Sequence, residues 1–257
     1  MRNAFRKGKR FITGASCAAM LSVMSAQAVA QPIKNIVLVH GAFADGSSWA
    51  AVTERLQNMG YHVSAVQNPL TSLDDDVAAT ERVLARQHGD VLLVGHSWGG
   101  AVISQAGNNS HVRGLVYLSA LAPATGESVT DLLARLNAPM SGLTPDAQGL
   151  VWLDDASQFQ QVMANDISTR NVQALAAVSQ PIALTAFQGK ITHAAWENRP
   201  SWYLLTENDH ALLPVVQEKI ARQIHATVYS VNSSHLSMVS QPDAVAKFID
   251  TAAKSFK

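Results

Sequence analysis

Six short apolar runs alternate with segments of helical period along most of this 257-residue chain. Runs such as "NIVLVH" and "DVLLVG" are too short for typical helices and too uniformly apolar for strands with one face in water. They are typical of parallel strands that are covered on both faces. The pattern predicts an α/β fold with a mostly parallel, doubly wound sheet. The predicted strands are 35–40, 62–66, 90–95, 114–119, 201–206 and 226–231.

The predicted helices lie between these strands, except in one long interval. They span 47–58, 75–87, 98–106, 214–224 and 242–253. Between Pro123 and Pro200 the sequence has helical patches, several prolines and no convincing strand, and it is too long for a plain loop. We expect a small helical cap at about 123–199, over the carboxyl edge of the sheet. A helical excursion on the side of the sheet is the alternative.

The first thirty residues have the pattern of an export signal. Five basic residues precede an apolar stretch at 11–25, and Ala26-Gln27-Ala28 and Ala28-Val29-Ala30 offer small residues for cleavage. We expect a signal peptide at 1–30, one domain at 31–257, and a periplasmic or secreted mature protein. An uncleaved membrane anchor is the alternative. Lipidation of Cys17 is disfavoured because no aliphatic residue stands in the preceding Gly14-Ala15-Ser16.

Removing that segment changes the charge and the cysteine content. Five of the 19 basic residues and none of the 19 acidic ones are lost, so the net charge becomes about −5. This disfavours nucleic acid as a partner. The only cysteine, Cys17, is lost as well, which excludes a disulfide or a cysteine metal site and suits an oxidising compartment. We expect no stable membrane association after cleavage.

A serine between glycines follows the third predicted strand. Gly95-His96-Ser97-Trp98-Gly99 fits the pattern G-x-S-x-G, with a buried strand before it and a helix rich in small residues after it. In that setting the motif forms a strained bend that exposes the serine hydroxyl above the sheet. The glycines allow close backbone approach, and the amino end of the helix favours negative charge nearby. Ser97 is therefore the candidate nucleophile.

A serine hydroxyl needs a neighbouring base to accept its proton. Among nine histidines, His235 is favoured because it lies in a loop between the last predicted strand and the last predicted helix. The carboxyl ends of parallel strands gather such loops at one edge of the sheet. His40 and His96 lie at strand ends beside the same site, where we expect them to pack or to hold loops.

A carboxylate must orient the imidazole and stabilise its protonated form. The segment "YLLTENDHALLP" offers Glu207 and Asp209 at the end of a predicted strand. Asp209 is preferred because it lies deeper in the turn, and because the order Ser97, Asp209, His235 is that of known hydrolases. Glu207 stays an alternative, and Asp209 as a plain turn or capping residue is another.

Acyl transfer also requires hydrogen-bond donors for a developing oxyanion. The segment "HGAFADGSSW" after the first strand is the natural source. We expect the backbone N–H of Ala42, with that of Phe43 next in line, to pair with the N–H of Trp98. A simple turn that closes the first strand is the alternative interpretation.

Together these motifs resemble the α/β-hydrolase superfamily over nearly all of the mature chain. More narrowly, they resemble the branch that contains plant methyl-ester esterases, hydroxynitrile lyases and small bacterial carboxylesterases such as those that cleave pyrethroids. The resemblance implies an α/β-hydrolase fold at 31–257, a Ser97–Asp209–His235 triad, an oxyanion hole from Ala42 and Trp98, and no cofactor or metal.

Two departures from the lyases favour hydrolysis. Lyases of this branch carry a threonine after the loop histidine and a lysine after the catalytic histidine, whereas Gly41 and Leu236 stand here. Without that lysine, no obvious cation would stabilise a leaving cyanide. Serine at position 97 likewise disfavours dehalogenases and epoxide hydrolases, which use aspartate there.

The predicted function is hydrolysis of a small-molecule carboxylic ester through an acyl-enzyme. We expect a mainly apolar substrate pocket, although each of its members could equally belong to the ordinary core. Two alternatives remain, namely non-ester chemistry on a lactone, a carbon–carbon bond or a peroxyacid, and a receptor-like member with little turnover. Oligomeric state is not predicted. The expected pocket residues are Phe43, Leu236, Met238, Trp152 and Trp196.

Overall fold

The computed structural model describes residue 1 and residues 32–256. The predicted signal peptide therefore lies almost wholly outside the described residues. Six strands form one sheet in the order β2-β1-β3-β4-β7-β8, and all five pairings are parallel. This confirms the predicted sheet. The strands are β1 (Asn35–Val39), β2 (His62–Ala65), β3 (Val91–His96), β4 (Val112–Leu118), β7 (Ser201–Thr206) and β8 (Thr227–Val231).

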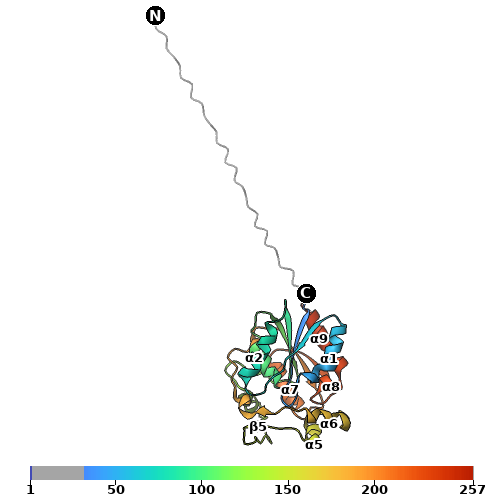
Figure 1. Cartoon of the computed structure of the whole chain (residues 1–257). Coiled ribbons are helices and arrows are strands. Elements are labelled where there is room, and N and C mark those ends of the chain that lie inside the picture. The colour runs from blue at the N-terminus through green and yellow to red at the C-terminus, as the bar shows by residue number, and fades with distance from the viewer. Residues whose placement is uncertain (2–31, 257) are drawn as a thin grey trace.

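Helices cover both faces of this sheet (Figure 1). Helices α1 and α9 pack on each other at one face, and α2 and α3 pack on each other at the opposite face. The predicted helix at 47–58 begins as a 3-10 turn, η1 (Gly46–Trp49), before α1. The other helices of these layers begin and end within three residues of the predicted ranges, except α8, which was not predicted: α1 (Ala50–Asn58), α2 (Leu73–Leu84), α3 (Gly99–Ala106), α7 (Pro214–Gln223), α8 (Ser237–Ser240) and α9 (Pro242–Lys254).

Burial explains why the central strands have uninterrupted apolar sequences. Every residue of β1, β3 and β7 is buried, because helices cover both sides of the sheet. The edge strand β8 is different, since four of its five residues are exposed. The parallel strands all end at one edge. Ser97 follows β3, Asp209 follows β7, and His235 follows β8, so the topology gathers the three at that edge.

The segment between β4 and β7 forms the cap, at the end of the molecule away from the C-terminus (Figure 1). It contains α4 (Val129–Arg135), α5 (Ala156–Met163) and α6 (Thr169–Ala177). It also contains a small antiparallel sheet of β5 (Leu150–Val151) and β6 (Ile182–Ala183), with two 3-10 turns, η2 (Leu184–Gln188) and η3 (Ala195–Glu197). The expectation of no strand here was wrong. Two-residue strands are too short to show an alternating pattern.

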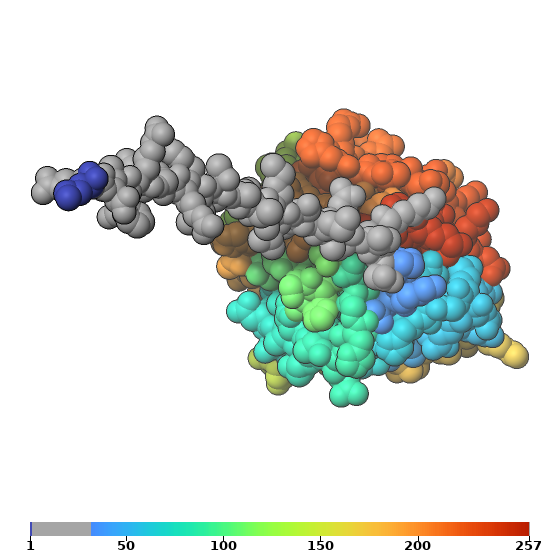
Figure 2. Space-filling model, turned by 90° about the horizontal axis from the view of Figure 1, so that it is seen from above, coloured from blue at the N-terminus to red at the C-terminus, as the bar shows by residue number. Residues whose placement is uncertain are grey.

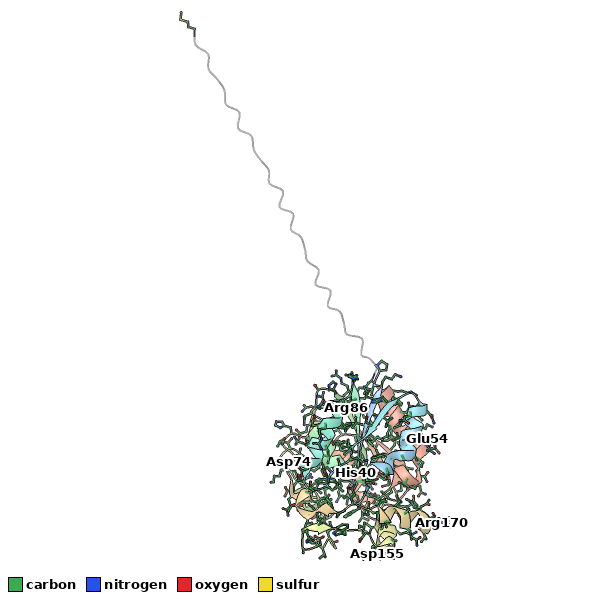
Figure 3. All side chains as sticks on the ribbon, viewed as in Figure 1. His40, Glu54, Asp74, Arg86, Asp155 and Arg170 are labelled. Atoms are coloured by element: carbon green, nitrogen blue, oxygen red, sulfur yellow. The ribbon has the colours of Figure 1, made fainter. Side chains whose placement is uncertain are left out.

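The start and the end of the domain lie together. Seen from above, the blue segments that open the domain lie beside the red C-terminal helix (Figure 2). Tyr61 donates a hydrogen bond to Asp250 over 2.7 Å, and Arg55 forms an ion pair with Asp243. His40 lies inside the fold, whereas the charged side chains labelled in Figure 3 are exposed. Among the described residues, no helix is long and apolar enough to cross a membrane.

Candidate active site

Ser97 sits at a sharp bend between β3 and α3. Its φ of +52° is a left-handed conformation that side chains rarely adopt. Glycines on both sides make this bend possible. A Cβ on Gly95 would lie 2.6 Å from the carbonyl oxygen of Gly99, and a Cβ on Gly99 would lie 2.5 Å from that of Val39. Both clashes involve backbone atoms, so neither position accepts a larger residue without a shift of the chain.

His235 and Asp209 form a buried pair beside this serine. Nδ1 of His235 lies 2.7 Å from Oδ2 of Asp209, and the two side chains are 2% and 0% exposed. Nε2 of His235 is therefore the ring nitrogen left for another partner. Ser97 and His235 line the same cavity. No hydrogen bond joins them in the part of the chain that the structure describes; in free enzymes this contact is often long and shortens when substrate binds.

The Asp209 carboxylate accepts five hydrogen bonds. Oδ1 accepts from two backbone N–H groups, and Oδ2 accepts from His235 and from two neutral side chains. Neutral and backbone donors stabilise a buried carboxylate without a cation. The other candidate, Glu207, is exposed and does not take this place. The donors besides His235 are Ala211 N and Leu212 N at 2.8 Å, Thr206 Oγ1 at 2.8 Å and Gln217 Nε2 at 2.9 Å.

The loop after β1 and the bend after β3 offer backbone N–H donors beside the cavity. Ala42, Phe43 and Trp98 all line the cavity. Within the described residues, their backbone N–H groups donate to no protein acceptor. Phe43 has a left-handed φ of +60°, so this loop is also strained. These N–H groups are available to an oxyanion, and the oxyanion hole of Ala42 and Trp98 stays a prediction.

His40 holds the loop that carries those donors, as its position in the sequence predicted. Asn68 donates its backbone N–H to Nε2 of His40 over 2.9 Å, so this nitrogen must be an acceptor. Nδ1 of His40 then donates to the carbonyl of Gly41, also over 2.9 Å. Burial lowers the pKa of His40. The ring is therefore neutral, with one fixed tautomer that ties the loop to residue 68.

His96 supports the loop of the candidate base. Its Nε2 lies 2.9 Å from the backbone carbonyl oxygen of His235, and a carbonyl can only accept. The two rings lie 4.7 Å apart between centroids. Complete burial, with the nearby His235 ring as a second cause, lowers the pKa of His96 well below its ordinary value. His96 is thus a neutral donor that positions the backbone of residue 235, which agrees with the predicted loop-holding role.

A buried carboxyl group lies behind the bend. Asp76 on α2 is fully buried and accepts hydrogen bonds from the indole Nε1 of Trp98 at 2.7 Å and from the backbone of Leu70 at 2.8 Å. Burial raises the pKa of Asp76 to about 6, although both hydrogen bonds favour its charged form. Asp76 was not predicted as a site residue, because a single aspartate in a helix among other acids carries no distinctive pattern.

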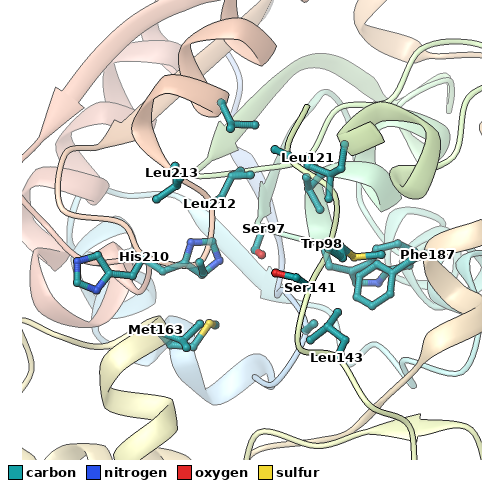
Figure 4. A pocket seen from close by; sticks show the side chains of 18 of the residues that line it. Ser97, Trp98, Leu121, Ser141, Leu143, Met163, Phe187, His210, Leu212 and Leu213 are labelled. Atoms are coloured by element: carbon teal, nitrogen blue, oxygen red, sulfur yellow. The ribbon is translucent and has the colours of Figure 1, made fainter. Parts of the chain in front are cut away.

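The cavity has a volume of about 430 Å³ and lies between the sheet edge and the cap. Figure 4 shows Ser97 and Ser141 with their hydroxyl groups directed into it, among mainly apolar side chains. No Asp, Glu, Lys or Arg is among its lining residues. The apolar wall comes from several segments: Leu121, Leu133, Ala138, Pro139, Met140, Leu143, Val162, Met163, Phe187, Leu212, Leu213 and Val216.

Of the five predicted pocket residues, only Phe43 lines this cavity. Leu236 and Met238 are 1% and 0% exposed and belong to the core beneath the histidine loop. The indole of Trp152 is exposed and donates to Asp146, and that of Trp196 donates to the carbonyl of Pro123. The structure does not place these four side chains in the lining of this cavity. The direction of a cap side chain depends on how the cap docks, which residue type does not reveal.

Most of the missed cavity residues come from the cap and from the loop after Asp209. The cap loop at 138–143 and the residues at 210–213 contribute to the wall. The apolar run in "DHALLP" is the one sequence pattern that could have indicated them. No group of three or more His, Cys, Asp or Glu side chains that could hold a metal occurs among the described residues.

Comparisons with known proteins identify the family of this chain. The profile of the Alpha/beta hydrolase family matches residues 36–248. An alpha/beta hydrolase named nvfD from Aspergillus novofumigatus is 29% identical over 241 residues, which cover 85% of this chain and 96% of that protein. A pyrethroid hydrolase from Sphingobium wenxiniae is 26% identical over 253 residues, which cover 86% and 90%.

Solved structures show the same fold. Polyneuridine aldehyde esterase superposes with a TM-score of 0.74 at 19% identity, covering 86% of this chain and 99% of that one. An extracellular alpha/beta-hydrolase from a Paenibacillus species gives 0.73 at 21% identity, covering 86% and 99%. Since the family profile spans most of the sequence, this chain belongs to the alpha/beta hydrolase family.

Proposed function

We propose that this protein is a serine hydrolase that cleaves small, uncharged carboxylic esters through a Ser97–His235–Asp209 triad. The observation that carries the proposal is the buried 2.7 Å contact of His235 with Asp209, beside a serine at a left-handed bend in one apolar cavity. Because this pair is buried, Nδ1 of His235 has Asp209 as its hydrogen-bond partner. Nε2 is therefore the nitrogen that accepts the serine proton.

The first half of the reaction forms an acyl-enzyme. Oγ of Ser97 attacks the ester carbonyl carbon while Nε2 of His235 takes its proton, and Asp209 stabilises the imidazolium. The carbonyl oxygen becomes an oxyanion, which the backbone N–H groups of Ala42 and Trp98 bind. The tetrahedral intermediate then expels the alcohol, and Nε2 returns the proton to the departing oxygen. Donors of this kind typically contribute about 3 kcal/mol each to transition-state stabilisation.

The second half releases the acid. A water molecule gives a proton to Nε2 of His235 and attacks the acyl carbon, and the same two N–H groups bind the second oxyanion. Collapse of this intermediate breaks the bond to Ser97, whose oxygen regains the proton from the imidazolium. The free carboxylic acid leaves, and the enzyme returns to its starting state with no group consumed.

The cavity supports the proposed substrate class. A volume of about 430 Å³ lies in the usual range for small-molecule sites, about 300–1,000 Å³. With no charged side chain in its lining, the cavity favours neutral esters with apolar acyl or alcohol groups. The name of one relative supports an ester bond, since it is a putative methylesterase of Arabidopsis thaliana.

Hydrolysis of p-nitrophenyl acetate and p-nitrophenyl butyrate tests the proposal. We expect turnover that Ser97→Ala reduces by about 10⁴-fold or more. Ser255→Ala is the matched control, because Ser255 is exposed at the end of α9, and it should keep the wild-type rate. Binding of an ester without serine-dependent turnover would instead favour a receptor-like protein. Turnover of a lactone or a peroxyacid alone would favour the non-ester alternative.

We further propose that residues 1–30 are removed during export and that the mature protein works in the periplasm or outside the cell. Amino-terminal sequencing of the protein from a periplasmic fraction and from the medium tests this. The expected first residue is near Gln31. A protein that keeps its first thirty residues and stays with the membrane fraction would instead be anchored.

A further inference from the structure

One segment of the cap contacts the loops of both proposed catalytic partners. This segment, residues 161–166, covers the end of α5 and the turn after it, and we call it the clamp segment. It forms hydrogen bonds with the residue before and the residue after His235. It also forms hydrogen bonds with the residue before and the residue after Asp209. A segment that only closed the cavity would not need hydrogen bonds to the chain on both sides of His235 and on both sides of Asp209.

The contacts to the histidine loop come from Asp166 and Met163. The Asp166 carboxylate accepts two hydrogen bonds from Ser234, one from the backbone N–H over 3.0 Å and one from the hydroxyl. The carbonyl of Met163 accepts the backbone N–H of Leu236 over 3.2 Å. Residues 234, 235 and 236 are each at most 1% exposed, so both contacts act on a buried loop. His235 is held from both sides.

The contacts to the aspartate loop come from Asn165 and Gln161. Nδ2 of Asn165 donates to the carbonyl of Asn208 over 3.1 Å. Nδ1 of His210 lies 2.9 Å from the carbonyl of Gln161, so the ring is the donor. The two loops are also joined directly, since the N–H of Asn208 donates to the carbonyl of Ser233 over 3.1 Å. The clamp segment therefore bridges both loops.

The same segment forms part of the cavity wall. Val162 and Met163 line the cavity, and Figure 4 shows Met163 on the same side as His210. Met163 thus contributes its side chain to the substrate site and its carbonyl to the loop of His235. A substrate that packs well on this side chain acts on an element that also holds the catalytic base.

We propose that the clamp segment positions the triad, and that Asp166 is the positioning residue for His235 by way of Ser234. This rests on the proposed esterase function. Asp166 does not touch the reacting atoms. It orients the loop so that Nε2 of His235 faces Ser97, and its loss lets the ring leave the geometry needed for proton transfer. Misplacement of a catalytic group by about 1 Å can cost about a hundredfold in rate.

Kinetics of Asp166→Ala with p-nitrophenyl butyrate test this assignment. We expect kcat to fall about tenfold to a hundredfold while KM changes by less than about threefold, because the cavity wall is intact. Asp166→Asn keeps one acceptor oxygen and should recover part of kcat. The matched control is Asp155→Ala. Asp155 accepts the N–H of Gln158 and caps α5, but it makes no contact with either catalytic loop in the described structure.

Proton NMR of the His235 Nδ1–H gives a readout that does not need turnover. The resonance of the imidazole proton shared with Asp209 should be sharp in the wild type and in Asp155→Ala, and broadened or lost in Asp166→Ala. Equal kcat and equal spectra for the two alanine variants would overturn the assignment. If Asp166→Ala does not fold, Asp166→Asn and Ser234→Ala answer the same question. Absence of serine-dependent turnover in the wild type would refute the proposed function instead.

Discussion

Asp209→Asn is the substitution for which the structure predicts the most specific failure. Oδ1 of Asp209 accepts the backbone N–H groups of Ala211 and Leu212, both at 2.8 Å. Backbone donors cannot turn away, so the single oxygen of an asparagine must stay on that side. Its NH₂ group then takes the place of Oδ2 and faces Nδ1 of His235, which lies 2.7 Å from that atom.

That arrangement selects the wrong tautomer of the base. Two donors cannot share one hydrogen bond, so Nδ1 of His235 must become the acceptor and the proton moves to Nε2. A protonated Nε2 in a neutral ring cannot take the proton of Ser97. The loss expected for a wrong tautomer is about 10⁴-fold in kcat, or about 5.5 kcal/mol at 1.36 kcal/mol per tenfold.

The assay is kcat for p-nitrophenyl butyrate with the purified variant, alongside circular dichroism and urea unfolding to show that it is folded. KM should change little, since the Asp209 side chain does not line the cavity. A folded Asp209→Asn enzyme with kcat within about tenfold of the wild type would refute the tautomer argument. Asp209 would then be a structural turn residue and not the orienting acid.

Three further predictions concern the residues that support the site. Burial raises the pKa of Asp76 from 3.8 to about 6, so the folded state binds the proton of this carboxyl group more tightly than the unfolded state does. The tighter binding stabilises the fold fully below about pH 4, and this stabilisation is lost as the pH rises to about 6. In urea titrations, the free energy of unfolding of the wild type relative to that of Asp76→Ala should therefore be about 2 kcal/mol larger at about pH 4.5 than at about pH 7. The same difference in free energy at both pH values would contradict this. Gly99→Ala places a Cβ 2.5 Å from the carbonyl oxygen of Val39 and should lower the free energy of unfolding by about 2–4 kcal/mol. An unchanged thermal midpoint would instead show that the bend can relax. Gln217→Leu removes one donor from Asp209 and leaves a buried backbone N–H of Thr206 without its acceptor. The free energy of unfolding should therefore fall by about 1–3 kcal/mol. A variant as stable as the wild type in urea would show that water replaces the glutamine.

The sheet could be predicted from the sequence because its signal is local. The central strands are buried on both faces and need continuous apolar runs, and each of the six predicted strands corresponds to an observed strand within two residues at either end. The nucleophile bend is local as well, since it needs glycines at fixed spacing. The pairing of Asp209 with His235 follows from topology, because parallel strands bring their carboxyl ends to one edge.

The cap and the supporting hydrogen bonds could not be predicted in the same way. Trp152 and Phe187 are both aromatic cap residues, yet only Phe187 lines the cavity. The difference depends on how the cap docks on the sheet. Gln217 meets Asp209 only because of the register of α7 against β7, and Asp166 meets Ser234 only because the cap turns back over the histidine loop. Such contacts depend on tertiary packing.

Labelling with a fluorophosphonate, followed by peptide mass mapping, tests the central claim most directly. A phosphonate traps the serine whose oxygen is activated by a neighbouring base, so it reports the nucleophile without a choice of substrate. We predict one adduct per chain, on Ser97, and none after Ser97→Ala or in the Asp209→Asn variant on the same timescale. No adduct on the folded wild-type protein, or an adduct on another serine, would contradict the proposed site.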